Sequence, residues 1–346
     1  GAKPSSIRTI VHSSAAVESK GSTASSPRAK ERLSRCVAVG FLILTFFVTV
    51  AMGVGVAAKP RGGPSMVASA RLEGARPRDM TYTRPVHPDP DMHRVLLAAS
   101  RVTLSEPVRG YEMGQDGCLP FSGFARYFEH MRWELGRRGH LADPQMPKRG
   151  VVRAQTHRYL GELRFPNTWT GRTHLIQVGG SSLHYGHEIT RGDGQVVVRA
   201  RTVIVLLDGS NRPAAAPGYL RDYVDGTLEA PTPLTLPEPA WTGTPTYTVH
   251  VRLSDQDSFG HVNQARYLDF ADDARRSAGL GRLLGVSLSY ERETLAGDTL
   301  VIELGSGSPA EGHSLPAARH AFRMVRTGDG VVVHRGVLEV AVERAE

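Results

Sequence analysis

One stretch near the C-terminal end decides the fold: Ser254-Asp255-Gln256-Asp257-Ser258-Phe259-Gly260-His261-Val262-Asn263-Gln264-Ala265-Arg266-Tyr267. It places the carboxylate of Asp257, the imidazole of His261 and the amide of Asn263 within seven residues. Apolar residues then recur at helical spacing from Tyr267 to Ala274, which predicts a helix that begins near Asn263. The first turn of a helix carries unpaired N–H groups and a positive dipole end, and both can hold a developing oxyanion. The stretch therefore predicts acid–base chemistry at a loop-to-helix junction.

An internal repeat with an offset of 140 residues includes this stretch. Ala-Arg-Tyr occurs at 125–127 and again at 265–267, and in each copy an arginine and two carboxylates precede it. Farther along, Gly-Asp-Gly occurs at 192–194 and at 328–330, each time beside alternating apolar runs. Asp-Gly in this setting predicts a β-hairpin in which both turn positions have positive φ. The repeat also predicts a helix in the first copy, beginning near Phe121.

Each copy thus predicts a strand, a loop, a long helix and then several antiparallel strands, which is an α+β organisation. A repeat of this length indicates two copies of a domain rather than a solenoid, whose units are shorter. We expect the two domains at about 96–228 and 245–346. The residues between them, 229–244, are rich in proline, which cannot continue a helix or a central strand, so they predict a semi-rigid linker.

The first 95 residues differ in composition from the rest of the chain. Residues 1–35 are basic and serine-rich without apolar periodicity, which predicts a disordered tail or a targeting segment. Residues 36–58 carry no charge and are long enough to span a bilayer, which predicts a transmembrane helix, or alternatively a signal that is removed. Residues 59–95 predict an irregular spacer. We therefore expect a membrane-anchored protein in an organelle such as a plastid, with the secretory pathway as the alternative.

Composition excludes several kinds of site. The two cysteines, Cys36 and Cys118, cannot form a disulfide framework or a cysteine-based zinc site. His184 and His187 lack a suitably spaced acidic or cysteine partner, so we expect strand residues there and no metal. Much of the excess positive charge, formally +8, lies in the N-terminal tail, and no nucleic-acid motif accompanies it. No cofactor is expected.

The opening stretch resembles the signature of plant-type fatty acyl-ACP thioesterases and of acyl-CoA thioesterases of the 4-hydroxybenzoyl-CoA type. In the plant-type enzymes the segment reads Asp-x-Asp-x-Asn-x-His-Val-Asn-Asn, followed by a tyrosine. The matching positions are Asp257, His261, Val262, Asn263 and Tyr267. Phe259 stands where that family has its catalytic asparagine. The resemblance covers about residues 100–346 and implies two tandem hotdog domains, each a long helix wrapped by a curled antiparallel sheet, joined as a pseudo-dimer.

The resemblance also implies roles for individual residues. Asp257 is expected to attack the thioester or to act as base toward a water, and His261 to orient that water or polarise the carbonyl. Asn263 is expected to hold the water or to cap the helix. Glu293, within the segment 289–294, matches a glutamate implicated in catalysis. The residues expected to contact substrate are Gly260, Phe259, Tyr267, Asp116 and Phe121.

The first copy lacks the Gly-His-Val-Asn element. After Asp116 the chain continues into Leu119, Pro120 and Phe121, which supply neither an imidazole nor an amide. We therefore expect one working site, in the second copy. The apolar residues of the first copy suit the far end of an acyl chain, whose burial contributes about 0.8 kcal/mol per methylene.

The implied function is hydrolysis of a fatty acyl thioester, carried on ACP or CoA, to a free acid and a thiol. Two alternatives stay open: a hotdog enoyl-thioester hydratase or dehydratase, and a non-catalytic acyl-binding protein. The segment 258–260 favours hydrolysis over hydration, because hydratases of this kind usually have Asn-Pro there. The expected partners are the carrier and, through 36–58, a membrane. A homo-oligomer of the pseudo-dimer is a further open alternative.

Overall fold

The computed structural model describes residues 100–137, 146–147, 149–312 and 316–342. They all belong to one unit of the chain, Met80–Glu346. The predicted tail, transmembrane helix and spacer lie outside the described residues. Within the described ranges, no helix is both long and apolar enough to cross a bilayer.

Both copies fold in the predicted order of strand, helix and antiparallel strands. The first copy contains β1 (Arg101–Pro107), α3 (Phe121–Leu135), β2 (Arg149–Tyr159), β3 (Thr168–Val178), β4 (Ser182–Arg191) and β5 (Val196–Leu207). The second contains β6 (Thr246–His250), α4 (Arg266–Ser277), β7 (Leu283–Tyr290), β8 (Thr299–Leu304), β9 (Ser308–Ala310), β10 (Ala317–Arg326) and β11 (Val332–Ala341). Short 3-10 turns are η1 (Gly110–Glu112), η3 (Gly218–Tyr223) and η4 (Leu253–Asp255).

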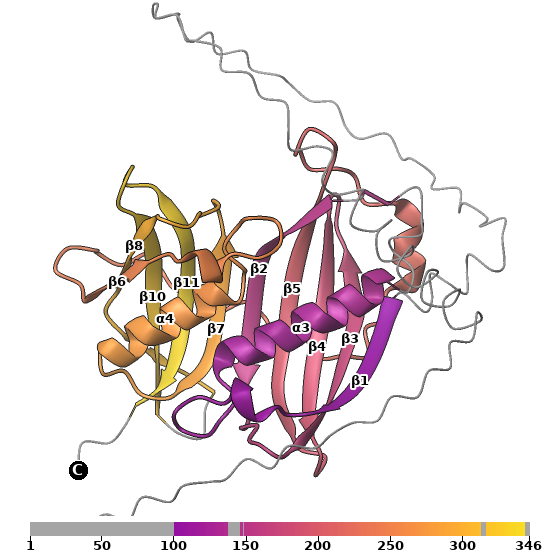
Figure 1. Ribbon diagram of the computed structural model, residues 1–346, viewed down its shortest axis with the longest axis horizontal. Helices are drawn as coiled ribbons and strands as arrows, with labels where there is room; N and C mark the ends of the chain where they lie inside the picture. The colour runs from indigo at the N-terminus through magenta and orange to yellow at the C-terminus, as the bar shows by residue number, and fades with distance from the viewer. Residues whose placement is uncertain (1–99, 138–145, 148, 313–315, 343–346) are drawn as a thin grey trace, which may run out of the picture. The chain divides into compact units, whose positions relative to one another are not determined.

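The strands join one antiparallel sheet in the order β1-β3-β4-β5-β2-β7-β11-β10-β8-β6, with β9 paired to β10. This order is symmetric about its centre, because β2 corresponds to β7, β5 to β11, β4 to β10, β3 to β8 and β1 to β6. At the centre Thr156 of β2 lies opposite Ser287 of β7, and their hydroxyl oxygens are 3.1 Å apart. An approximate two-fold axis therefore passes through the β2–β7 pair, and the two copies form a pseudo-dimer (Figure 1).

The two helices lie across the same face of the sheet and contact each other (Figure 1). Four residues at helical spacing on α3, Phe124, Phe128, Met131 and Leu135, are at most 2 % exposed. The buried apolar residues of α4 are Tyr267, Leu268, Phe270, Ala271 and Ala274, whose spacing predicted that helix. Burial of each large side chain contributes about 1.5–3 kcal/mol, so this layer between helices and sheet is the main core of the fold.

The starts of the two helices agree with the sequence to different degrees. α3 begins at Phe121, as predicted. α4 begins at Arg266, a little after the predicted Asn263. The Asn263 side-chain oxygen accepts the Ala265 N–H at 2.9 Å, and the Asn263 carbonyl accepts the Arg266 N–H at 2.9 Å. These bonds form a separate turn, which delays the first regular helical residue.

Both Gly-Asp-Gly segments form hairpin turns, which confirms that prediction, but their geometry differs from the one expected. Only the second glycine of each segment has positive φ: 89° at Gly194 and 69° at Gly330. Asp193 and Asp329 do not share this conformation. The Asp193 Oδ1 accepts the Gln195 N–H at 3.0 Å, so this aspartate stabilises its turn through its side chain rather than through its own backbone.

The segment between the copies, 229–244, contains neither helix nor strand. The Leu234 N–H donates to the Ser287 hydroxyl at 2.7 Å, which fixes this segment against β7. Tyr290 of β7 reaches Gln264 at the start of α4, so it points to the helix face. Successive strand residues alternate between faces, so Ser287 and the segment 229–244 lie on the opposite, outer face.

Candidate active site

The loop that precedes α4 is a tight turn that presents Asp257 and His261. The Asp257 N–H donates to the His261 carbonyl at 2.8 Å, and the Gly260 N–H donates to the Asp257 carbonyl at 3.0 Å. Gly260 has a φ of 77°, which residues with a Cβ adopt only at a cost. The Val262 N–H donates to the Thr294 carbonyl at 3.3 Å, which ties the loop to the segment after β7. Gly260 therefore shapes the loop, whatever its contact with substrate.

Asp257 lines a cavity of about 560 Å³ between the start of α4 and one face of α3. Its Oδ1 accepts the Phe259 N–H at 2.9 Å, and no described residue donates to its Oδ2. The residues that line the cavity are all polar or charged: Arg126, Glu129, Ser254, Asp255, Gln256, Asp257, Asn263 and Arg266. A carboxylate oxygen open to a polar cavity is what a general base toward water, or a nucleophile, requires.

His261 and Glu293 form a pair beside this loop. The His261 Nε2 lies 3.0 Å from a Glu293 carboxylate oxygen, and the two side chains are 49 % and 66 % exposed. A carboxylate at one ring nitrogen fixes the orientation and tautomer of an imidazole. Neither residue belongs to the cavity lining. The structure thus brings together Glu293 and His261, which are distant in sequence, and separately places Asp257 with Asn263.

Asn263 is committed to two bonds. Its Nδ2 donates to the Glu129 carboxylate at 3.1 Å, and its Oδ1 accepts the Ala265 N–H. Of the two roles expected from the sequence, holding a water or capping the helix, the contacts show neither: the Oδ1 bond closes the turn before α4, whose N-cap residue is Ala265. The bond to Glu129 adds a third role, because it joins the start of α4 to α3 of the other copy.

The cavity contains charged residues that sequence analysis did not identify, chiefly Glu129 and Arg126 of α3. The Arg126 guanidinium lies 3.1 Å from the Asp269 carboxylate of α4, so these groups link the two helices. The repeat contains a signal for them, because it aligns Arg126 with Arg266 and Glu129 with Asp269. The sequence does not show, however, that the start of α4 lies beside α3.

Phe259, expected to contact substrate, lies on the exposed side of the loop. Its side chain is 53 % exposed and stacks on Trp133 of α3, with ring centroids 6.3 Å apart and an interplanar angle of 11°. Trp133 itself is 51 % exposed. The stack fixes the Asp257 loop to the first copy, so an aromatic residue at position 259 has a structural reason.

Three other expected substrate residues lie outside the cavity lining. Tyr267 is buried and its hydroxyl is hydrogen bonded to Thr294; burial raises the pKa of this phenol to about 12. Phe121 stacks on Tyr159 in the first copy, with centroids 4.5 Å apart. Asp116 is exposed, and its carboxylate lies 3.7 Å from the Arg276 guanidinium of α4. Tyr267 and Phe121 therefore act through packing in this conformation.

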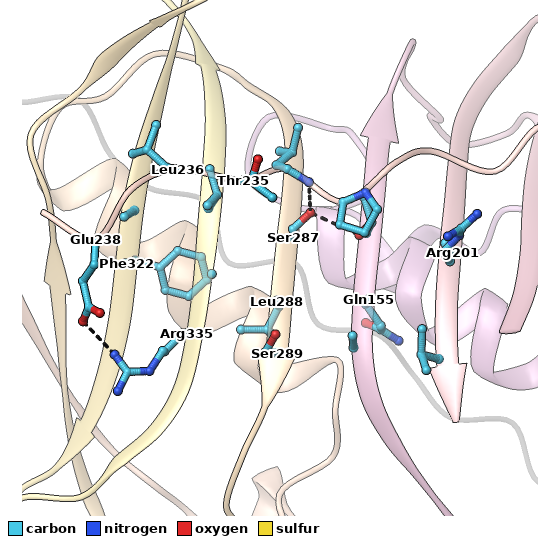
Figure 2. Close-up of a pocket in the computed structure, with 18 of the residues that line it drawn as sticks. Gln155, Arg201, Thr235, Leu236, Glu238, Ser287, Leu288, Ser289, Phe322 and Arg335 are labelled. Atoms are coloured by element: carbon cyan, nitrogen blue, oxygen red, sulfur yellow. Dashed lines mark hydrogen bonds and ion pairs between the residues drawn. The ribbon is translucent and has the colours of Figure 1, made fainter. Parts of the chain in front are cut away.

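A second cavity, of about 390 Å³, lies on the outer face between the sheet and the segment 229–244 (Figure 2). Arg335 and Glu238 form an ion pair across it at 2.9 Å, and Ser287 bonds Leu234 there. This groove is lined by neither Asp257 nor the His261–Glu293 pair. The candidate site is therefore on the helix face.

A long helix on a curled antiparallel sheet, repeated about a two-fold axis with a carboxylate at the start of one helix, defines a double-hotdog protein with a candidate acid–base site. Residues 114–231 match the family model of the thioesterase-like superfamily, and residues 243–332 match the model of the acyl-ACP thioesterase C-terminal domain. No curated protein matches the chain.

Solved structures of the same architecture resemble the whole described unit. An acyl-ACP thioesterase from Bacteroides thetaiotaomicron aligns with a TM-score of 0.56 at 18 % identity, over 70 % of this chain and 98 % of that one. The 12:0-ACP thioesterase from Umbellularia californica aligns with a TM-score of 0.58 at 15 % identity, over 70 % and 98 %. Identities this low establish the fold. The structures confirm the predicted double-hotdog fold, and the two family models confirm the predicted resemblance to acyl thioesterases.

Proposed function

We propose that the chain hydrolyses acyl groups from acyl carrier protein at a single site built around Asp257. The observation that carries this proposal is the open carboxylate oxygen of Asp257 in a polar cavity, beside the His261–Glu293 pair. The match to the acyl-ACP thioesterase C-terminal domain, residues 243–332, includes all of these residues. The names of the two structural neighbours favour a carrier protein over coenzyme A.

The arrangement suits attack by water on the thioester carbonyl. Asp257 takes a proton from the water, whose oxygen bonds to the carbonyl carbon. The C–S bond then breaks, the thiolate leaves with a proton, and the acid is released. His261, oriented by Glu293, is placed to donate a hydrogen bond to the oxyanion or the departing sulfur. Direct attack by the Asp257 carboxylate, followed by hydrolysis of the anhydride, uses the same groups.

The decisive experiment is thiol release from acyl-ACP and acyl-CoA by the Asp257→Asn protein. We expect kcat to fall by about a hundredfold or more, the range common for loss of a general base. Asp208→Asn is a matched control, because the Asp208 carboxylate also accepts N–H bonds of its own turn, at 2.7 Å from Ser210 and 3.0 Å from Arg212, but away from the cavity. Equal activity of both variants and the parent would move the chemistry elsewhere.

The non-catalytic alternative would have gained support from an Asp257 without a cavity beside it. Asp257 lines a cavity, so this observation favours catalysis. The hydratase alternative is checked in the same assay: an enoyl thioester that gains water without releasing thiol would replace hydrolysis as the reaction.

Membrane attachment is a separate part of the proposal. Residues 36–58 form an uncharged run of spanning length, and the described thioesterase unit begins well after them. We expect the full chain to pellet after carbonate extraction of membranes and a shortened chain that begins near residue 90 to remain in the supernatant. If both remain in the supernatant, residues 36–58 are a removed signal and the secretory or organellar route replaces anchoring.

A further inference from the structure

The catalytic loop of the second copy faces the interior of the first. Asn263 bonds Glu129 of α3, as described above, and the next residue, Gln264, is hydrogen bonded through its side chain to Gln155 of β2. The Tyr290 hydroxyl lies within hydrogen-bond distance of the Gln264 carbonyl, at 3.0 Å, and of the Gln155 side-chain oxygen, at 3.1 Å. The start of α4 therefore borders the layer between α3 and the first-copy strands.

That layer contains a polar cluster. Arg132, one turn along α3 from the cavity residue Glu129, donates to the Thr202 hydroxyl at 3.2 Å. Thr202 is also 3.0 Å from the Nε2 of His187, and the Nδ1 of His157 is 3.0 Å from the Tyr159 hydroxyl. Thr202, His157 and His187 are fully buried. This is an unusual interior for a site that receives a hydrocarbon chain.

The two-fold axis shows that three of these positions are polar in the first copy alone. With Thr156 opposite Ser287, the axis exchanges Gln155 with Val286 and His157 with Leu288. Thr202 pairs with Gln155, and Leu338 pairs with Val286, so the axis also exchanges Thr202 with Leu338. At all three places the second copy has an apolar residue. The fold therefore does not require polar residues there.

Some donors and acceptors in this layer lack partners. The Nε2 of His157 and the Nε2 of Gln264 are buried without a hydrogen bond. Arg132 forms no ion pair with any carboxylate among the described residues, and burial lowers the pKa of its guanidinium, an effect that the Glu129 carboxylate one turn away opposes. Buried polar groups without partners are costly. A ligand with oxygen acceptors would satisfy them.

We propose that the acyl group of the substrate carries an oxygen acceptor, a carboxylate, hydroxyl or keto group, that binds between α3 and β2 at Arg132, His157 and Gln264. The inference rests on the proposed function, because it assigns the acyl specificity of the same site. It places the recognition in the first copy and the chemistry in the second. A plain hydrocarbon chain leaves these groups unpaired and is the poorer substrate.

The first test compares hexanoyl-, 6-hydroxyhexanoyl-, adipoyl- and dodecanoyl-CoA. We expect kcat/KM for adipoyl- or 6-hydroxyhexanoyl-CoA to exceed that for hexanoyl- and dodecanoyl-CoA by about tenfold or more, the discrimination that one hydrogen bond to a charged group provides. If neither oxygenated substrate exceeds the plain chains by that margin, the inference is wrong. Binding of the same thioesters to the Asp257→Asn protein, measured by calorimetry, gives the order of preference without turnover. Failure of this inference is therefore distinguishable from failure of the proposed function.

The second test changes the cluster toward the second copy. Arg132→Met, and the pair His157→Leu with Thr202→Leu, should each remove the preference, with the plain chains becoming equal or better substrates. Arg132→Lys keeps the positive charge and should retain part of the preference for the oxygenated substrates. Arg201→Met is the matched control, because Arg201 neighbours Thr202 in β5 and points to the outer face. Folded variants, checked by circular dichroism, that keep the parent's preference would overturn the assignment.

Discussion

Asp257 and Asp116 lie in corresponding loops of the two copies but in different surroundings. The hydrogen bonds that the two loops share align Asp257 with Gly114, two residues before Asp116. Asp257 lines the cavity and keeps one carboxylate oxygen unbonded by described residues. Asp116 is exposed, faces Arg276, and accepts the Cys118 N–H at 3.0 Å. Leu119, which follows, is 4 % exposed and belongs to the core. One copy has the candidate acid–base group in this loop, and the other copy has core packing.

The comparison predicts that Asp116→Asn retains kcat within about twofold, as surface substitutions commonly do, whereas Asp257→Asn loses it. Titration with a non-hydrolysable acyl thioester should give one site per chain. Two equivalent sites, or activity in the Asp257→Asn protein that disappears only when Asp116 is changed as well, would contradict a single site.

At the residue scale, the sequence predicts groups that are close along the chain or matched by a signature. Asp257 and Asn263 belong to one short stretch, and Glu293 is recognised by its own segment. The sequence does not predict a role for Glu129 or Arg132 at the site, because that role depends on which copy lies opposite the catalytic loop. That relation is set by the packing of α3 against the start of α4, which no local pattern encodes.

At the element scale, the catalytic loop depends on one backbone conformation. Gly260 has a φ of 77°, and a Cβ at this position would meet nothing within 4 Å, so any cost of a side chain is conformational. We expect Gly260→Ala to lower the free energy of unfolding by about 1 kcal/mol and to reduce kcat by shifting Asp257. Chemical denaturation and thiol release are the measurements.

Gly209→Ala is the control for this substitution. A Cβ at Gly209 also meets nothing within 4 Å, but the residue lacks the left-handed conformation. Its replacement should leave stability and turnover near the parent values. If Gly260→Ala behaves in the same way, the loop tolerates another conformation and Gly260 has no special role in placing Asp257.

Elements were predictable where a period or a turn signal is strong. The apolar spacing of α3 and α4 and the two Asp-Gly hairpins are of this kind, and the structure contains them all. The turn conformation at Asp193 was not predictable, because an aspartate can stabilise a turn either through positive φ or through its side chain. The pairing of β2 with β7 was not predictable either, since neither strand contains a sequence signal for its neighbour in the other copy.

At the scale of the whole molecule, buried histidines make stability depend on pH. Burial lowers the pKa of His157 and His334 to about 3 and that of His187 well below its ordinary value. In the unfolded chain these groups bind protons below a pH of about 6.5, whereas in the folded chain they stay neutral. Stability is therefore fully present above that pH and is lost as pH falls toward 3.

We expect Tm to fall continuously from pH 6.5 to pH 4, since each such histidine removes about 1.4 kcal/mol per pH unit. Replacing His334 by Leu should reduce the slope by one proton, which calorimetry across this range measures. A Tm that is flat between these values would mean that the histidines gain protons in the folded state as well.

The continuous sheet across β2 and β7 has a consequence for how this enzyme varies. In a dimer of identical chains, every substitution is made twice, so a change that suits one site is also imposed on the other. Here the two copies are encoded separately, although they share one sheet. The first can replace Val, Leu and Leu by Gln155, His157 and Thr202 while the second keeps Val286, Leu288 and Leu338. A single gene can therefore encode a first copy that recognises the acyl group and a second copy that carries out the chemistry.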